Sequence, residues 1–181
     1  MFVLKRIILA FTSIVLMLCV LAGCGTAQPQ TTETTELSYE PPKGFVADEN
    51  IEGLYRSPDY PDDMSNIVVS TDTRTADFDD MDKEYFKENC LEILAYTADV
   101  DADTIDYTVT TAYVAGYKAV KTTVEFVIEP DASEFEAEAT EVKQIQYAVF
   151  VDDSDVLWLF TLTQVGDNDW EKAFESSING K

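Results

Sequence analysis

Residues 142–163 read VKQIQYAVFVDDSDVLWLFTLT. In the first part of this stretch the apolar side chains fall at odd positions, namely Ile145, Tyr147, Val149 and Val151. A two-residue period of this kind predicts a β-strand. Residues 152–155 are acidic and indicate a turn, and residues 156–163 are apolar at nearly every position, which is typical of a central strand covered on both faces. The stretch therefore predicts two successive antiparallel strands, the second of them at the centre of a sheet.

Further strands are predicted on the N-terminal side of this stretch. Residues 105–113 and 117–129 alternate apolar with polar side chains, and Gly116 marks the turn between them. In the first of these strands one row of side chains, made up of Ile105, Tyr107, Val109, Thr111 and Tyr113, alternates with Asp106, Thr108 and Thr110. In the second, Lys121 and Glu125 lie opposite the apolar row. Shorter strands are expected at residues 38–40, 45–49, 54–57 and 66–71.

Two helices complete the predicted fold. Residues 81–97 follow Asp79 or Asp80 as N-cap, and their apolar stripe consists of Phe86, Cys90, Ile93, Leu94 and Thr97. Residues 169–178 begin with Asn168 and Glu171 at capping-box spacing, and Gly180 can end the helix. The sequence thus predicts an α+β domain, a twisted antiparallel β-sheet of about six to eight strands covered by a central helix and a C-terminal helix.

The N-terminus has the layout of a secretory signal. Lys5 and Arg6 precede an apolar run over residues 7–21, and the run ends in Leu21-Ala22-Gly23-Cys24. This box resembles the lipobox of bacterial lipoproteins. The resemblance implies that residues 1–23 are removed, that Cys24 is lipidated, and that the mature chain is anchored on the extracytoplasmic face of a bacterial membrane. An ordinary signal peptide with a chance cysteine is the alternative interpretation.

The rest of the chain divides into a linker and one domain. Residues 24–36 are rich in Thr, Gln and Glu and contain no large apolar side chain, so we expect a flexible tether. Residues 37–181 form a single domain of ordinary size. Once the signal is removed and Cys24 is lipidated, Cys90 has no partner for an intramolecular disulfide.

Composition excludes several classes of function. The chain of 181 residues has 12 Lys plus Arg, 35 Asp plus Glu and no His, for a formal net charge of -23. Such a chain cannot neutralise phosphates, so no nucleic-acid partner is expected. Without His, the sequence also excludes Ser-His-Asp and Cys-His catalysis and zinc sites built on imidazole.

The order of several short motifs resembles the PsbP-like family. The motifs are Pro42-Lys43-Gly44-Phe45, Tyr55-Arg56-Ser57-Pro58-Asp59, Asn66-Ile67-Val68-Val69, Gly116-Tyr117-Lys118-Ala119 and Phe174-Glu175-Ser176-Ser177-Ile178. The resemblance spans residues 38–178 and implies a PsbP-like α+β fold with an accessory or binding role. It carries over no catalytic residues, because the family has no shared catalytic set.

Acidic loops are the first candidates for a ligand site. Asp99, Asp101 and Asp103 have the alternate spacing that opens a calcium loop, and Ca²⁺ prefers roughly six to eight oxygen ligands. Thr104 and Thr110 stand where that loop needs Gly and Glu, so a solvated acidic loop is the alternative. Two weaker candidates are the sets Asp59, Asp62, Asp63 and Asp152, Asp153, Asp155.

Other candidates depend on single side chains. Aromatic side chains could line a ligand groove, but packing in the core and on half-buried strands is the favoured alternative. Tyr60, in a loop with two prolines, is the best candidate for the groove; the others are Tyr55, Tyr113, Tyr117, Trp158 and Trp170. Cys90 lies on the apolar stripe between acidic neighbours, which favours a buried structural thiol over a nucleophile. Carboxylate pairs are too common in this chain to indicate acid–base catalysis.

These observations favour one function class. We expect a membrane-anchored extracytoplasmic lipoprotein that acts as a non-catalytic binding or accessory module, with the membrane reached through Cys24 and a protein or envelope ligand as partner. The first alternative is a protein that binds Ca²⁺ through its Asp-rich loops, without any other cofactor. The second is a carboxylate-based hydrolase.

Overall fold

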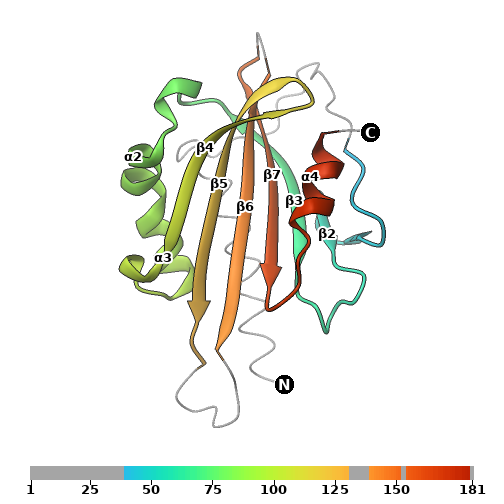
Figure 1. Ribbon diagram of the computed structural model, residues 1–181. Helices are drawn as coiled ribbons and strands as arrows, with labels where there is room; N and C mark the ends of the chain where they lie inside the picture. Colours follow the sequence, from blue (N-terminus) through green and yellow to red (C-terminus); the bar gives the residue numbers. More distant parts are fainter. Residues whose placement is uncertain (1–38, 131–138, 152–153, 180–181) are drawn as a thin grey trace.

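The computed structural model describes residues 39–130, 139–151 and 154–179. In this part of the chain seven strands form one sheet in the order β1-β2-β3-β7-β6-β5-β4, and every neighbouring pair is antiparallel (Figure 1). The strands are β1 (Val46–Ala47), β2 (Leu54–Arg56), β3 (Asn66–Thr73), β4 (Asp106–Val114), β5 (Tyr117–Ile128), β6 (Thr140–Phe150) and β7 (Val156–Val165). The α+β fold with a sheet and two covering helices is therefore confirmed.

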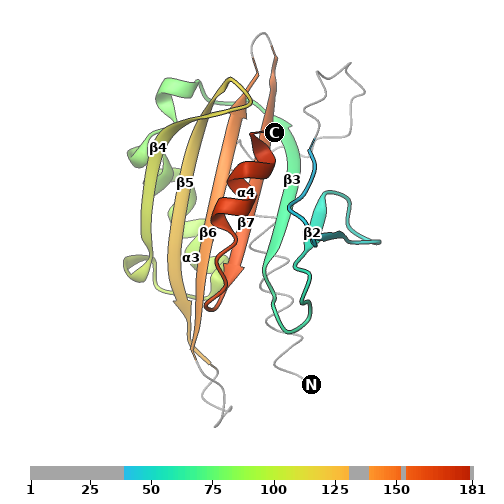
Figure 2. The same cartoon turned by 45° about the vertical axis from the view of Figure 1, so that its right-hand side comes forward.

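The helices lie on opposite faces of the sheet, as Figure 2 shows. A central helix runs through α2 (Lys83–Phe86), a π-helical turn (Lys87–Leu91) and α3 (Glu92–Ala98), and α4 (Glu171–Ile178) is the last element. Short 3₁₀ turns precede and follow the central helix, at Phe78–Asp80 (η2) and Ala102–Thr104 (η4). None of the helices described is long and apolar enough to cross a membrane.

The hairpin that dominates the sequence pattern lies at the centre of the sheet. β7 is paired on one side with β3 and on the other with β6, with Leu159 opposite Ser70 and Ala148. Leu159 and Leu162, on opposite faces of β7, are both fully buried. The prediction of a central strand covered on both faces is confirmed, and pairing with β3 brings the N-terminal strands beside the C-terminal hairpin.

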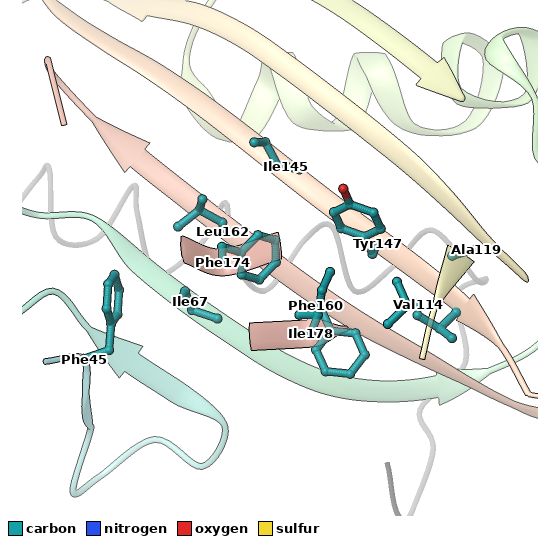
Figure 3. Packing of buried hydrophobic residues seen from close by; sticks show 11 residues of the cluster. Phe45, Ile67, Val114, Ala119, Ile145, Tyr147, Phe160, Leu162, Phe174 and Ile178 are labelled. Carbon is teal, nitrogen blue, oxygen red and sulfur yellow. The ribbon is translucent and has the colours of Figure 1, made fainter. Parts of the chain in front are cut away.

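On one face, α4 covers an apolar cluster shown in Figure 3. Phe174 and Ile178 point from the helix onto Ile67 of β3, Tyr147 of β6 and Leu162 of β7. Phe174 is fully buried, and burying one such ring stabilises a fold by roughly 1.5–3 kcal/mol. We call this surface of the sheet the α4 face.

Tyr39 joins the start of the described chain to the α4 face. Its ring packs against the rings of Tyr55 and Phe160, at centroid distances of 5.4 and 5.5 Å. Its hydroxyl lies 3.4 Å from Oγ of Ser177 in the last turn of α4. The first residue described and the last helix therefore pack together.

On the other face, the central helix packs on β4, β5 and the start of β6. Its buried side chains follow one another at four-residue steps through Phe86, Cys90, Leu94 and Ala98. Ile93, predicted to belong to this stripe, is 36 % exposed, and Ala95 is buried in its place. The π-helical turn widens the helix ahead of Ile93, which shifts the residues that face the sheet.

The start of the central helix also differs from the prediction. Residues 78–80 form the 3₁₀ turn η2, so neither Asp79 nor Asp80 caps the helix. Asp82 is the N-cap, and its Oδ1 accepts a hydrogen bond from the backbone N–H of Tyr85 at 2.9 Å. The helix therefore begins at Lys83, two residues later than predicted.

Two predicted N-terminal strands are shorter or absent. Of the strand predicted at residues 38–40, Ser38 lies outside the described residues, and Tyr39 and Glu40 are not in a strand, because the prolines that follow have no N–H for a ladder. The strand predicted at residues 45–49 is reduced to β1, because Oδ1 of Asp48 accepts the N–H groups of Asn50 and Ile51 and turns the chain.

The capping box predicted for the last helix does not form. Trp170 occupies the N-cap position without a capping side chain, and the backbone carbonyl of Asn168 accepts a hydrogen bond from Gln164 instead. Glu171 turns its carboxylate to the sheet rather than back to its own helix. Gly180 lies outside the described residues.

Candidate functional site

A groove of about 440 Å³ opens on the α4 face where β5, β6 and β7 approach the start of α4. Its walls are mainly polar, and the charged residues along them are Asp106, Glu125, Glu141, Lys143 and Asp167. Phe126 and Val142 beneath it are buried, whereas Val127 on its wall is 42 % exposed. The groove is larger than a hollow of about 190 Å³ beside β4.

Two lysines of the sheet bind α4, and one of them, Lys143, lines the groove. Nζ of Lys143 lies 2.8 Å from Oε2 of Glu171 and 3.4 Å from Oε1 of Glu125. Nζ of Lys121, on the neighbouring strand β5, lies 2.9 Å from Oε1 of Glu171 and 2.7 Å from Oε1 of Glu175. Glu171 thus binds both lysines and Lys121 binds both α4 carboxylates.

Tyr147 completes this network. Its hydroxyl donates a hydrogen bond of 2.6 Å to Oε1 of Glu175, the same oxygen that Lys121 contacts. Burial and the hydrogen bond to Glu175 raise the pKa of Tyr147 to about 12, so the phenol stays protonated as a donor. We refer to Lys121, Lys143, Tyr147, Glu171 and Glu175 as the lysine–glutamate network.

The network fixes the ionisation of its carboxyl groups. Burial alone would raise the pKa of Glu171, but hydrogen bonds from Lys143 and Lys121 outweigh it and hold the pKa below its ordinary value. For Glu175, burial is outweighed in the same way by hydrogen bonds from Lys121 and Tyr147. Both side chains are therefore carboxylates near neutral pH and poor proton donors.

Asp63 anchors the loop that follows β2 to the start of α4. Its carboxylate accepts hydrogen bonds from Oγ of Ser57 at 2.7 Å, the N–H of Ser65 at 2.8 Å and Nε1 of Trp170 at 3.0 Å. Burial would raise its pKa, but these donors together lower it. Asp63 is a structural carboxylate turned into the protein, so it does not join Asp59 and Asp62 in a cation site.

Tyr60 lies on the surface of the same loop. Its ring is 36 % exposed, and the guanidinium of Arg56 stacks over it at 4.4 Å from the centroid. Nε of Arg56 also contacts Oδ2 of Asp48 at 2.6 Å. The structure therefore pairs Tyr60 with a cation of its own chain, away from the groove beside α4.

The other aromatic candidates do not share one groove. Tyr55, Tyr117, Trp158 and Trp170 pack against the apolar cluster of the α4 face. Tyr113 is 63 % exposed near the end of β4, apart from that cluster.

The acidic loop after the central helix does not gather its side chains. Asp99 ends α3 in the left-handed conformation, with φ of 57°, and Asp101 caps η4 by accepting the N–H of Asp103 at 3.0 Å. Across the described residues, no three acidic or cysteine side chains are grouped so as to hold a metal ion. Cys24, Asp152 and Asp153 lie outside the described residues, and the backbone carbonyl of Asp155 pairs with Arg74.

Cys90 is buried, as the apolar stripe predicts. It is 6 % exposed on the side of the central helix that faces the sheet, and burial raises the pKa of its thiol to about 12. A thiol in this state is protonated and unreactive near neutral pH.

The lysine–glutamate network was not predicted from the sequence. Lys121 and Glu125 were expected on one face of their strand, and the structure confirms this placement. The partners Glu171 and Glu175 lie 50 and 54 residues from Lys121 along the chain. The available signal was the i, i+4 spacing of the two glutamates, which sets both on one side of α4.

Comparison with protein-family models and with curated proteins gives no match to this sequence. Among solved structures, the crystal structure of LpqN, involved in cell envelope biogenesis of Mycobacterium tuberculosis, is similar to this chain. The similarity covers 80 % of this chain and 80 % of that chain, with 11 % sequence identity and a TM-score of 0.41. The lipobox and the PsbP-like resemblance stay predictions from the sequence.

Proposed function

We propose that this protein is a lipid-anchored extracytoplasmic lipoprotein that acts as a non-catalytic binding or accessory module, with the groove beside α4 as its ligand site. The observation that carries the proposal is Lys143, which lines that groove and is bound to α4 through the lysine–glutamate network. The charged groups of this network are already paired with one another and held in place by α4. A preorganised polar wall of this kind favours recognition of a protein or envelope ligand.

The same observation weighs against a carboxylate hydrolase. A general acid that works near neutral pH needs a raised pKa, as a buried and unpaired carboxyl group has. The described carboxyl groups whose pKa departs from its ordinary value are all shifted down: Asp48, Asp63, Glu171 and Glu175. Binding is therefore a better use of this surface than proton transfer.

The PsbP-like motifs and the lipobox support the remaining parts of the proposal. The family resemblance implies an accessory role, and the lipobox implies attachment at Cys24. Membrane attachment is tested by comparing Cys24→Ala with the matched variant Cys90→Ala in membrane fractions of expressing cells. We expect Cys24→Ala to move into the soluble fraction and Cys90→Ala to stay with the membrane. A Cys24→Ala variant that stays in the membrane pellet contradicts the anchor.

Ligand binding at the groove is tested by thermal unfolding in the presence of fractionated envelope extract. A ligand that binds the folded protein raises the unfolding midpoint. Val127→Arg places a bulky charge on the groove wall, whereas Tyr96→Arg alters a side chain that is 86 % exposed on α3. We expect a fraction that stabilises the wild type and Tyr96→Arg but not Val127→Arg. An equal response of both variants contradicts the groove as the site.

Absence of catalysis is tested with the same fractions. The purified chain is incubated with envelope glycans, lipids and peptides, and products are followed by mass spectrometry. We expect no turnover above that of the buffer. Turnover that Glu175→Gln abolishes would show that the network is catalytic.

A further inference from the structure

β4 forms one edge of the sheet, farthest from β2, as Figures 1 and 2 show. It is joined to β5 by the two residues Ala115 and Gly116, with φ of 50° and 90°, so Val114 and Tyr117 flank a tight hairpin turn. From such a turn, hydrogen-bonded pairs alternate along the strand. Even-numbered residues of β4 pair with β5, and the odd-numbered residues turn N–H and C=O outward.

Those outward groups have no strand beside them. The residues concerned are Tyr107, Val109, Thr111 and Tyr113, and none of their backbone groups forms a hydrogen bond to another element of the described chain. Thr108 and Thr110, which alternate with these residues along β4, are exposed, so solvent reaches the edge. The opposite edge, β1, is only two residues long.

The β4 edge lacks the features that usually prevent strand pairing. Its sequence, DYTVTTAYV, has one charged residue and neither Lys nor Pro. The register with β5 runs from Asp106↔Glu125 to Val114↔Tyr117 without a bulge. Natural edge strands are commonly short, charged, bulged or interrupted by proline. An edge of nine residues without these features is suited to receive a partner strand.

A small cavity lies beside this edge on the face of the central helix. It has a volume of about 190 Å³, and apolar side chains of Phe78, Met81, Val109 and Val120 contribute to its walls. Asp79, Asp82 and Lys83 are the charged residues around it. A strand added to β4 would direct every second side chain to this face, so one of them would reach the cavity.

Charge selects the kind of partner. The chain has a formal net charge of -23, and Asp106 at the start of β4 lies opposite Glu125. Two copies of such a chain repel each other, which disfavours pairing of β4 with the β4 of a second copy. A basic segment gains from the same field.

We propose that the outer edge of β4 binds an extended basic segment of a partner protein as an added strand, with its basic side chains on the α4 face and one apolar side chain in the cavity between η2 and β4. This edge meets the groove beside α4 only at Asp106, which lines the groove and begins β4, and the inference goes beyond the function proposed above.

The test uses the full chain and a fluorescein-labelled peptide of alternating lysine and valine, followed by fluorescence anisotropy. One control peptide has glutamate for lysine, and another has methylated backbone nitrogens on the pairing edge. Thr111→Pro removes an outward N–H of β4 without removing a hydrogen bond to β5, and Thr111→Val keeps that N–H. We expect binding of the basic peptide by the wild type and Thr111→Val, and about tenfold weaker binding by Thr111→Pro.

A second pair of variants leaves the backbone unchanged. Thr110 is exposed on β4, so Thr110→Lys should weaken binding of the basic peptide roughly threefold and Thr110→Glu should strengthen it, by charge across adjacent strands. Val127→Arg, in the groove, should leave peptide binding unchanged, which separates this inference from the groove proposal.

Three results would overturn the inference. The first is that the acidic peptide, or the peptide with methylated backbone nitrogens, binds as tightly as the basic peptide. The second is equal affinity of Thr110→Lys and Thr110→Glu, which holds whether or not Thr111→Pro folds. The third is a wild-type dimer in sedimentation that Thr111→Pro dissociates while no basic peptide binds, because a second copy would then be the occupant.

Discussion

The two helical layers are held to the same sheet by different interactions. The central helix, residues 83–98, presents an apolar stripe, and no described ion pair joins it to the sheet. α4 has eight residues and buries only Phe174 and Ile178. It adds the lysine–glutamate network and Trp170. Apolar contacts are non-directional, whereas ion pairs and hydrogen bonds fix orientation. The helix beside the groove is thus the one whose position is specified by charge.

The largest expected effect comes from removing the apolar part of each layer. Phe174→Ala should lower the free energy of unfolding by about 3–5 kcal/mol, and Leu94→Ala in the central helix by about 2–5 kcal/mol. Both side chains are at most 2 % exposed. Chemical denaturation followed by circular dichroism measures the changes. A loss below about 1 kcal/mol for Phe174→Ala would mean that charge alone holds α4.

Removing a charged side chain should lower the free energy of unfolding in the α4 layer but not in the central helix. Lys121→Met leaves Glu171 and Glu175 partly buried without this partner and should cost about 1–2 kcal/mol, between the values for exposed and buried pairs. Lys83→Met, at the exposed start of α2, removes only a cation over the ring of Tyr107 at 4.9 Å. We expect no measurable change for this control. Equal losses in the two variants would contradict the comparison.

Of the two helical layers, α4 is the one that acid should weaken through the lysine–glutamate network. The pKa values of Glu171 and Glu175 are lowered in the folded protein from the ordinary value of 4.5, so their contribution is complete above that pH. It is lost as pH falls below 4.5 through the lower folded-state values. The difference in unfolding free energy between the wild type and Lys121→Met should therefore be constant at higher pH and narrow in acid. The wild type and Lys83→Met should stay parallel.

The smallest effect is kinetic and concerns the central helix. In a Cys19→Ser, Cys24→Ala background Cys90 is the remaining thiol, and burial with a pKa of about 12 should make it unreactive toward a disulfide reagent in the folded protein. Leu94→Ala should speed its modification, because it loosens the apolar layer above the thiol. Lys121→Met should leave the rate unchanged. Acceleration by both variants would indicate that the two layers open together.

Periodicity along the chain predicted most of the fold. The strong apolar runs of β6 and β7 lie where they were expected, and so do Phe86, Cys90 and Leu94 of the central helix, whereas Ile93 does not. Gln144 and Gln146 show what alternation misses: they are 1 % and 2 % exposed, and their amides donate across the sheet to Thr163 and Thr161. A polar side chain in a strand is predicted to face solvent unless the neighbouring strand that supplies its hydrogen-bond partner is known.

The site was harder to predict because its contacts are distant in sequence. Asp63 and Trp170 are separated by 107 residues, and the two lysines meet α4 only when β5 and β6 are in register. The acidic loop of Asp99, Asp101 and Asp103 had the most obvious spacing, but its backbone turns at Asp99 and Asp101 and sends the carboxylates apart. Spacing identifies ligands only where the local backbone is already known.

The contact of Tyr39 with Ser177 has a mechanical meaning. If the chain is anchored through Cys24, tension on the linker enters the domain at Tyr39, and the rings of Tyr55 and Phe160 and the last turn of α4 bear that load first. The strands behind them are joined by ladders of many hydrogen bonds and yield later. In that case a stretched linker would loosen α4 before the sheet and disturb the groove beside it. The affinity for a ligand in the groove would then depend on the tension between the domain and its anchor.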